Sequence, residues 1–298
     1  MLGANKEIRL RIAFIGTGRV AHTLALALHR AGWPIAALSN RNLAPAKRLA
    51  TQLPGCIAYA DAQSVADAAD LTFITVPDDA IAEVAQALRW RRGAAVVHCS
   101  GATEVSVLRS AAAQGAIIGA FHPLQGFSDP EIALRTLGGC AAAIEAAEPL
   151  YTQLSEIATA IGMRPLALPT GARALYHLSG SYAASFIAVL LHEAVGIWEG
   201  FGISRTEALA ALLPLARGSL EGIAAQGPLA ALTGPLSRGD AGTLARHLQA
   251  LREKQPERLA LYVQLAQRSL DMAEQRGLST EAVQSLQAAL DEAMRSRP

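Results

Sequence analysis

The stretch IAFIGTGRVA at residues 12–21 decides the fold of this chain. Four apolar residues typical of a buried strand run directly into the glycine pattern GxGxxA, and the apolar spacing of a helix follows. In such a turn Gly16 permits the tight bend, Gly18 lets the backbone approach a pyrophosphate, and Ala21 allows the helix to pack closely on the strand. The stretch therefore predicts a dinucleotide-binding turn whose cofactor contacts include Gly16, Thr17, Gly18, Arg19 and Val20.

The residues that follow the second predicted strand indicate which dinucleotide binds. A fold that prefers NAD places Asp or Glu about 20 residues beyond the glycines, where the carboxylate binds the ribose 2′-hydroxyl. No acidic residue occurs in residues 8–60, and the second strand ends in Ser39, Asn40 and Arg41. Because a guanidinium pairs bidentately with a phosphate, these residues predict NADP as the cofactor. The alternative is that Arg41 is a solvated loop residue.

Length and composition favour small-molecule chemistry. The 298 residues suffice for two domains, and a net charge of +1 gives no basic excess for binding nucleic acid. The three cysteines form no CxxC pair, so we expect neither a metal site nor disulfides, and we expect a reducing, cytoplasmic location. The longest uncharged stretch, residues 174–191, contains histidine and serines. It therefore favours a buried helix that lines a site over a membrane span.

The pattern of elements changes near Pro169. Strand-like runs alternate with helical stretches in the first half, and they lie at residues 11–15, 35–38, 71–76, 94–98, 117–120, 139–144 and 165–168. Long Ala- and Leu-rich helical stretches then take over, at residues 175–201, 205–226, 241–254, 256–276 and 280–296. We expect an α/β dinucleotide-binding domain with a Rossmann-type, mostly parallel sheet over residues 1–168. An all-α domain for substrate binding and dimerisation should span residues 169–298.

Three loops of the first domain follow predicted strands, which is where such a sheet binds its ligands. They carry VPDD at residues 76–79, HCSGA at 98–102 and FHPLQ at 121–125. We expect His122 to act at the reacting end of the cofactor, although a histidine at a strand end can also be a hydrogen-bonded structural group. The first two loops supply the remaining predicted cofactor contacts, namely Val76, Pro77, Asp78, Ser100 and Gly101.

The helical half offers two further groups of polar residues. His177, Ser181 and Ser185 recur at four-residue spacing, so they share one face of a helix and could donate to a hydride acceptor. The alternative is a polar seam inside a helix bundle. The turn LTGPLSRGD at residues 232–240 leads into a helix, and we expect it to form a carboxylate clamp with Arg238, Asp240 and His247 nearby. Asp240 could instead simply cap that helix, with Arg238 as a surface ion-pair partner.

Together these stretches resemble a bacterial family of two-domain proteins with a Rossmann-like N-terminal domain and a helical C-terminal domain of formerly unassigned function. That family is allied to ketopantoate reductases, pyrroline-5-carboxylate reductases and β-hydroxyacid dehydrogenases. The specific stretches are FHPLQGF at residue 121, ALYHLSGSYAASF at 174 and LTGPLSRGD at 232. The family's helix usually reads closer to YHxAxxFASN, so Ser185 stands where Asn is expected. The helix also lacks the lysine that hydroxyacid dehydrogenases use there.

The resemblance implies an NADP-dependent oxidoreductase that transfers a hydride between NADPH and a small, ketopantoate-like keto acid. We expect His177 to donate the proton to the reduced group or to polarise that group, with support from Ser181 and Ser185. His122 should position the nicotinamide or the substrate. One alternative is an imine reductase of the pyrroline-5-carboxylate type, and another is a non-catalytic NADP-binding sensor. The long apolar helices predict a homodimer packed through the helical domain.

Overall fold

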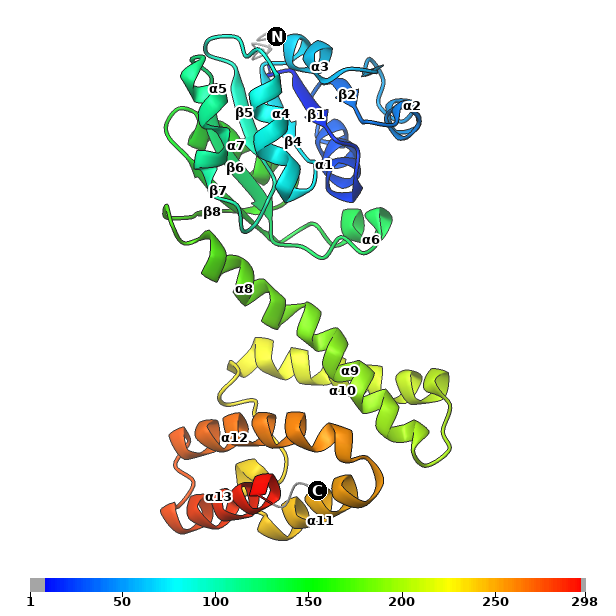
Figure 1. The fold of residues 1–298 in the computed structure, drawn as a ribbon, viewed down its shortest axis with the longest axis vertical. Helices are drawn as coiled ribbons and strands as arrows, with labels where there is room; N and C mark the ends of the chain where they lie inside the picture. Colours follow the sequence, from blue (N-terminus) through cyan, green and yellow to red (C-terminus); the bar gives the residue numbers. More distant parts are fainter. Residues whose placement is uncertain (1–8, 296–298) are drawn as a thin grey trace, which may run out of the picture. The chain divides into compact units, whose positions relative to one another are not determined.

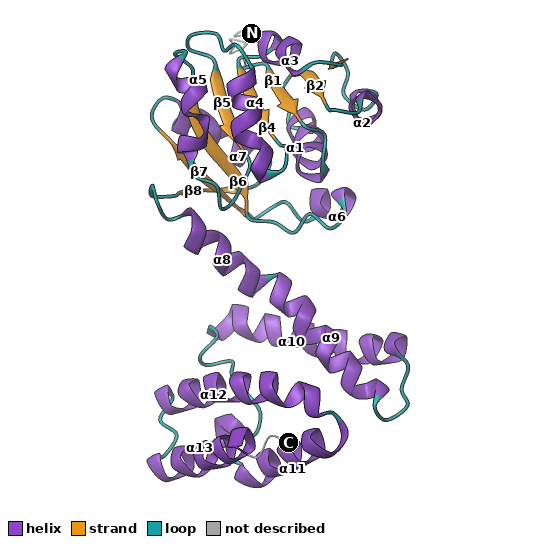
Figure 2. Cartoon of the chain, viewed as in Figure 1, coloured by secondary structure: helices purple, strands orange, loops and turns teal. Residues whose placement is uncertain are grey.

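The computed structural model describes residues 9–295. The chain divides into two compact units, Met1–Ala184 and Ser185–Pro298. All strands belong to the first unit, and the second is entirely helical apart from its connections (Figure 2). The predicted fold class is therefore confirmed.

The first unit is built on one eight-stranded sheet with the order β3-β2-β1-β4-β5-β6-β7-β8. All neighbouring strands are parallel except β6 and β7, which run antiparallel. The order reverses between β1 and β4, so the segments that follow these two strands run to opposite faces of the sheet and leave room for a ligand. The strands are β1 Ile12–Ile15, β2 Ile35–Ser39, β3 Ile57–Tyr59, β4 Leu71–Ile74, β5 Ala95–His98, β6 Ile117–Pro123, β7 Ala141–Ala146 and β8 Arg164–Ala167.

Helices cover both faces of this sheet. One hydrophobic cluster joins a face to α1 (Arg19–Arg30), α2 (Leu43–Ala50) and α7 (Leu150–Ala160). A second cluster joins the other face to α3 (Ala62–Ala68), α4 (Ile81–Ala87) and α5 (Arg109–Ala113), and α4 and α5 lie in front of the sheet in Figure 1. The short helix α6 (Pro130–Arg135) packs beside α1, and the 3-10 turns η1 (Asp78–Ala80) and η2 (Val105–Leu108) precede α4 and α5.

Helix α8 (Arg173–Ala183) belongs to the first unit. The sequence placed the boundary between residues 168 and 169, where the strands end. The structure moves it to Ala184 because Arg173 is fully buried and binds Glu145 on β7 and the carbonyl of Ser100 after β5. A composition change marks the end of the sheet, whereas the boundary depends on which core the next helix contacts.

The second unit contains helices close to those predicted. They are α9 Ser185–Glu199, α10 Arg205–Gln226, α11 Ala241–Lys254, α12 Leu259–Gln275 and α13 Thr280–Arg295, with 3-10 turns η3 Leu236–Arg238 and η4 Pro256–Arg258. Its core is formed by leucines of α11, α12 and α13, such as Leu244, Leu270 and Leu286. Ser204 caps α10 in a capping box with Glu207, which explains why that helix begins where predicted.

Two elements differ from the prediction. The single helix expected over residues 175–201 is interrupted at Ala184, whose φ of −129° and ψ of −69° are not helical, so α8 and α9 are separate. Strand β3 was not predicted, because it is only three residues long and lies at the edge of the sheet with Ile57 53% exposed. A short edge strand with little buried apolar surface gives no periodic signal.

Candidate functional site

A cavity of about 410 Å³ lies at the carboxyl ends of β1, β2 and β4. Its walls come from the glycine turn, the end of β2, the loop after β4, the start of α3 and the residues Glu83, Val84 and Ala87 of α4. The structure thus brings together residues that the sequence predicted separately as cofactor contacts, namely Gly16, Thr17, Gly18, Ser39, Asn40, Arg41, Val76 and Pro77.

The glycine turn has the backbone geometry that a pyrophosphate requires. Gly16 has a φ of +96°, and a Cβ there would lie 2.7 Å from the carbonyl oxygen of Thr75, so only glycine fits. A Cβ at Gly18 would meet no atom within 4 Å, which leaves open space beside the backbone. Helix α1 begins directly afterwards without a side-chain cap. Its first amide groups are therefore available to an anion.

A buried polar atom in the same turn also lacks a partner. Among the described residues, Thr17 Oγ1 is buried and makes no hydrogen bond. Such a group is costly to leave unsatisfied, so it is a reason to expect a polar ligand at this point. The uncapped helix, the space at Gly18 and this hydroxyl fit a dinucleotide phosphate.

The outer end of the cavity is formed by Ser39, Asn40 and Arg41. The Asn40 side chain donates to the carbonyl oxygen of Asn42, and Asn42 caps α2. Within residues 9–295 the Arg41 guanidinium has no hydrogen bond or ion pair, and it is exposed. It is therefore free to pair with a phosphate.

Arg19 lies in the turn but its side chain serves another purpose. Its guanidinium donates to the carbonyl oxygens of Phe127 and Ser128, at 3.0 and 3.2 Å, in the loop after β6. Neither Arg19 nor Val20 lines the cavity. Arg19 thus ties that loop to the start of α1.

A second cluster forms where the loop after β5 meets α8. An added Cβ at Gly101 would lie 2.5 Å from His177 Cδ2 and 2.8 Å from His122 Nε2, so the two imidazoles flank this glycine. Their ring centroids are 5.9 Å apart. The preceding Ser100 donates to Asp78 Oδ2 at 2.6 Å. The structure therefore brings His122 and His177, predicted as catalytic residues, together with Asp78, Ser100 and Gly101, predicted as cofactor contacts.

The charge state of this cluster is set by burial. The pKa of His122 is lowered to about 4, first by burial and then by His177 and Arg173, while Asp78 acts in the opposite direction. The pKa of His98, beneath the same loop, is also lowered to about 4, chiefly by burial and then by Arg173. Burial raises the pKa of Tyr176 to about 12. The imidazole rings of His122 and His98 are accordingly neutral at physiological pH.

Two residues of α8 that organise this cluster, Arg173 and Tyr176, were not predicted from the sequence. Arg173 is fully buried, with Nε donating to Glu145 Oε2 at 2.7 Å and a second nitrogen donating to the Ser100 carbonyl at 2.7 Å. Tyr176 has its hydroxyl 2.8 Å from His122 Nδ1. The sequence does contain a signal for Arg173, because it is the only Asp, Glu, Lys or Arg in residues 165–192.

The other predicted catalytic residues are distributed over both units. Ser181 lies on α8, and Ser185 is the exposed first residue of α9. In the second unit Asp240 caps α11 by accepting from the amide of Thr243, which is the structural alternative that the sequence left open. Arg238 ends η3, and His247 Nδ1 lies 2.9 Å from the hydroxyl of Tyr262.

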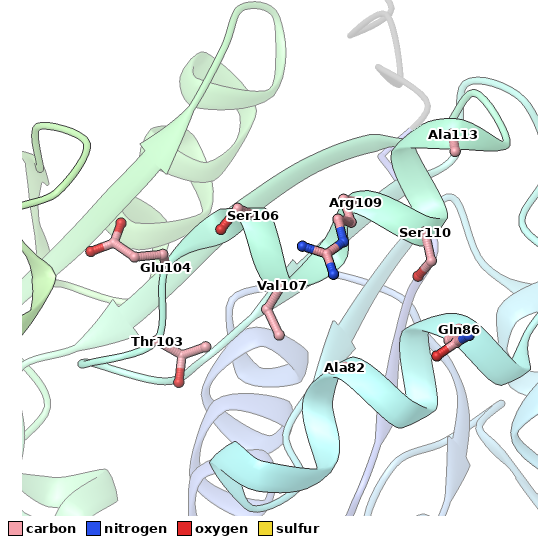
Figure 3. Close-up of a pocket in the computed structure, with 9 residues that line it drawn as sticks. All are labelled: Ala82, Gln86, Thr103, Glu104, Ser106, Val107, Arg109, Ser110 and Ala113. Atoms are coloured by element: carbon pink, nitrogen blue, oxygen red, sulfur yellow. The ribbon is translucent and has the colours of Figure 1, made fainter.

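A larger hollow of about 650 Å³ lies between α4 and the η2–α5 segment (Figure 3). It contains none of the predicted site residues. Its lining consists of Ala82, Gln86, Thr103, Glu104, Ser106, Val107, Arg109, Ser110 and Ala113.

Comparison with protein families agrees with this architecture. Residues 3–123 match a Rossmann-like domain model, and residues 140–269 match a domain of unknown function, DUF2520. The chain joins a Rossmann-like domain to a DUF2520 domain. The family resemblance predicted from the sequence is therefore confirmed. A comparison with curated proteins gave no match.

Solved structures share the whole fold. A candidate NADP oxidoreductase from Bacteroides fragilis is 25% identical with a TM-score of 0.73, over 88% of this chain and 98% of that one. A reductive aminase from Aspergillus terreus, in complex with NADPH and ethyl-5-oxohexanoate, is 17% identical with a TM-score of 0.60, over 96% and 94% of the two chains. Pyrroline-5-carboxylate reductase from Streptococcus pyogenes is 14% identical with a TM-score of 0.61, over 96% and 99%. At these last two identities the likeness is one of fold.

Proposed function

We propose that this protein is an NADP-dependent oxidoreductase that reduces a small keto or imino acid. The observation that carries the proposal is the cavity at the carboxyl ends of β1, β2 and β4. It combines an uncapped helix start and an unpartnered Thr17 hydroxyl with an unpaired Arg41. The B. fragilis relative, described as a candidate NADP oxidoreductase, supports the same cofactor.

The residues of the site fit three parts of NADPH, namely its pyrophosphate, its 2′-phosphate and its nicotinamide. The backbone of Gly16 to Gly18 and the start of α1 would hold the pyrophosphate, and Ser39 and Arg41 would hold the 2′-phosphate. The loops that carry Pro77 and Gly101 would border the nicotinamide. When bound, NADPH supplies the hydride.

The reacting end of the site offers hydrogen-bond donors to the substrate. Hydride addition to C=O or C=N places negative charge on oxygen or nitrogen, and a preorganised donor stabilises that charge. His122 and His177 flank Gly101 and can provide it. A keto acid of the ketopantoate type is the substrate that the family resemblance favours. An imine is the second candidate, because a reductive aminase and a pyrroline-5-carboxylate reductase share the fold.

Two measurements test the function. Calorimetric titration should give tighter binding of NADPH than of NADH, and a panel of keto acids and cyclic imines should reveal substrate-dependent NADPH oxidation. Gly18→Val should fill the space beside the turn and weaken NADPH binding at least tenfold, which is about 1.4 kcal/mol. Gly138→Val is the matched control, since a Cβ there also meets no atom within 4 Å and the residue lies outside the cavity.

Two results would count against this function. Equal binding of both dinucleotides would refute the choice of NADP. Tight NADPH binding without turnover across the panel would favour a dinucleotide sensor instead of an enzyme.

We further propose that the protein is a cytoplasmic homodimer that packs through its apolar helices. Leu175 on α8 is 74% exposed and Leu215 on α10 is 68% exposed, and each helix has a further exposed leucine, Leu178 and Leu220 respectively. Apolar surface of this extent normally marks an interface. Two stretches, Arg173–Glu199 and Arg205–Gln226, are also long and apolar enough to cross a membrane by length and composition alone.

Light scattering distinguishes these possibilities. A dimer that Leu215→Glu converts to a monomer supports the proposal. A monomeric wild-type protein, or one that requires detergent and co-sediments with lipid vesicles, would refute it.

A further inference from the structure

The imidazole of His122 is held from two elements at once. The residue lies near the end of β6, and its Nδ1 is 2.8 Å from the hydroxyl of Tyr176 on α8. The two rings meet edge to face, with centroids 5.5 Å apart and an interplanar angle of 89°. This pair therefore fixes both the position and the orientation of the imidazole.

The chemistry of the pair sets the location of the proton. A phenol is a better donor than a neutral imidazole N–H, and an imidazole nitrogen is a better acceptor than a phenol oxygen. Tyr176 therefore donates to Nδ1. A neutral imidazole whose Nδ1 accepts carries its single proton on Nε2.

The opposite nitrogen packs close to Gly101, where even a methyl side chain would clash with the ring. A Cβ at Gly101 would lie 2.8 Å from His122 Nε2 and 2.9 Å from Cε1. In the described part of the chain Nε2 has no hydrogen-bond partner, and it is not among the buried atoms. The N–H donor on Nε2 is thus unsatisfied by the protein, and the atom is not fully buried, so a ligand can approach it from the side that Gly101 does not cover.

We propose that His122 is the hydrogen-bond donor to the reducible group of the substrate, through Nε2–H, and that Tyr176 is the positioning residue that fixes this tautomer. The proposal rests on the proposed reductase function. The ring donates a hydrogen bond and keeps its proton, so the proton that completes the product has another source. His177 remains the residue that the sequence predicts for that role.

The charges around His122 keep the ring in the state required. The titratable and charged groups that face it are His98 on β5, Asp78 on η1, and Arg173, Tyr176 and His177 on α8. Arg173 and His177 oppose a second proton on the ring, and Asp78 alone favours it. Burial adds to the opposition, so the pKa lies at about 4 and the ring stays neutral above pH 5.5.

This arrangement selects a class of substrate. A neutral N–H donor matches the lone pair of a ketone oxygen or of an unprotonated imine nitrogen. A protonated iminium presents its own N–H and has no lone pair to accept. The site therefore favours a keto acid over an iminium.

The tautomer can be measured without any substrate. In full-length protein with ¹⁵N-labelled histidine, ring spectra of His122, assigned with His122→Gln, should show one neutral Nε2–H tautomer from pH 6 to pH 8. Tyr176→Phe should give a mixture of tautomers. Tyr151→Phe is the matched control, because it removes a hydroxyl on α7 that makes no hydrogen bond to any residue from 9 to 295. A protonated ring, an Nδ1–H tautomer in the wild type, or a Tyr176→Phe spectrum like that of the wild type would overturn the assignment.

Steady-state kinetics of His122 variants test the donor role separately from the proposed function. With a keto substrate, His122→Ala should lower kcat about 100-fold, the loss typical of an oxyanion donor. His122→Gln retains an N–H donor and should recover about tenfold, and NADPH affinity should change little in either. Equal turnover of the two variants would refute the donor role. If no substrate on the panel reacts, the proposed function fails while the tautomer result still stands or falls by itself.

Discussion

Replacing Arg173 by methionine tests whether the buried guanidinium holds the reacting end of the site together. The side chain is fully buried at the start of α8. It makes two hydrogen bonds of 2.7 Å, one to Glu145 and one to the Ser100 carbonyl. Methionine fills a similar volume, so the change removes charge and hydrogen bonds with little loss of packing.

The expected loss of stability follows from what the variant leaves behind. The Glu145 side chain is only 11% exposed and loses its ion-pair partner, while the Ser100 carbonyl loses a charged donor. Breaking a buried ion pair by removing one partner typically costs about 3–5 kcal/mol. We therefore expect Arg173→Met to lower the free energy of unfolding by about that amount.

Urea unfolding of a double-mutant cycle provides the measurement. Adding Glu145→Gln removes the unpaired charge and should restore at least about 1 kcal/mol, which appears as a coupling energy between the two sites. The exposed pair Arg11 and Asp70 is the control, and breaking it by Arg11→Met should cost no more than about 1 kcal/mol. The reasoning fails if Arg173→Met costs as little as the surface variant, or if the cycle shows no coupling.

Three further predictions concern the cofactor, the loop and pH. Arg41→Ala should weaken NADPH binding by about 1.5–3 kcal/mol and leave NADH binding nearly unchanged, and titration of both cofactors would contradict this if the losses were equal. Gly101→Ala should force apart His122 and His177 at a cost of about 1–3 kcal/mol in unfolding free energy, and an unchanged urea midpoint would refute the contact. Because the pKa values of His98 and His122 lie near 4 in the folded state and near 6.5 when unfolded, the unfolded chain binds more protons between those values. Stability should therefore fall as pH drops from 7 to 5, by about 2 kcal/mol for each ring, and urea unfolding at the two pH values checks it.

The cofactor cavity could be predicted from sequence because its parts are local. Most of its predicted contacts are a backbone turn or a strand end, and the short motifs around Gly16, Ser39 and Val76 specify them directly, whereas the α4 wall with Glu83 was not predicted. The parallel sheet then brings their carboxyl ends together without further information. The side-chain direction of Arg19 could not be predicted, since its carbonyl partners lie more than 100 residues away in the chain.

The organisation of the reacting end could not be read in the same way. Periodicity places His177 and Ser181 on one helical face, but it carries no information on the partner of Tyr176, which is 54 residues earlier in the chain. Arg173 was recognisable only as an isolated charge, and its role depends on a carboxylate from β7 and a carbonyl from the loop after β5. Such roles arise from tertiary contacts between elements that no local pattern links.

The same contacts explain why α8 belongs with the sheet although its composition matches the helices that follow. Arg173 binds Glu145 and the Ser100 carbonyl. Tyr176 binds His122. Because Gly180 has no side chain, Leu124 can approach to 3.3 Å from the position that a Cβ of residue 180 would occupy. These contacts recur at intervals of three and four residues, so they lie on one face of α8, while its outward face carries residues such as Leu175. Hydropathy averages the two faces and reports only an apolar helix. A charged or aromatic polar residue within such a stretch is therefore the feature that best indicates which unit the helix completes.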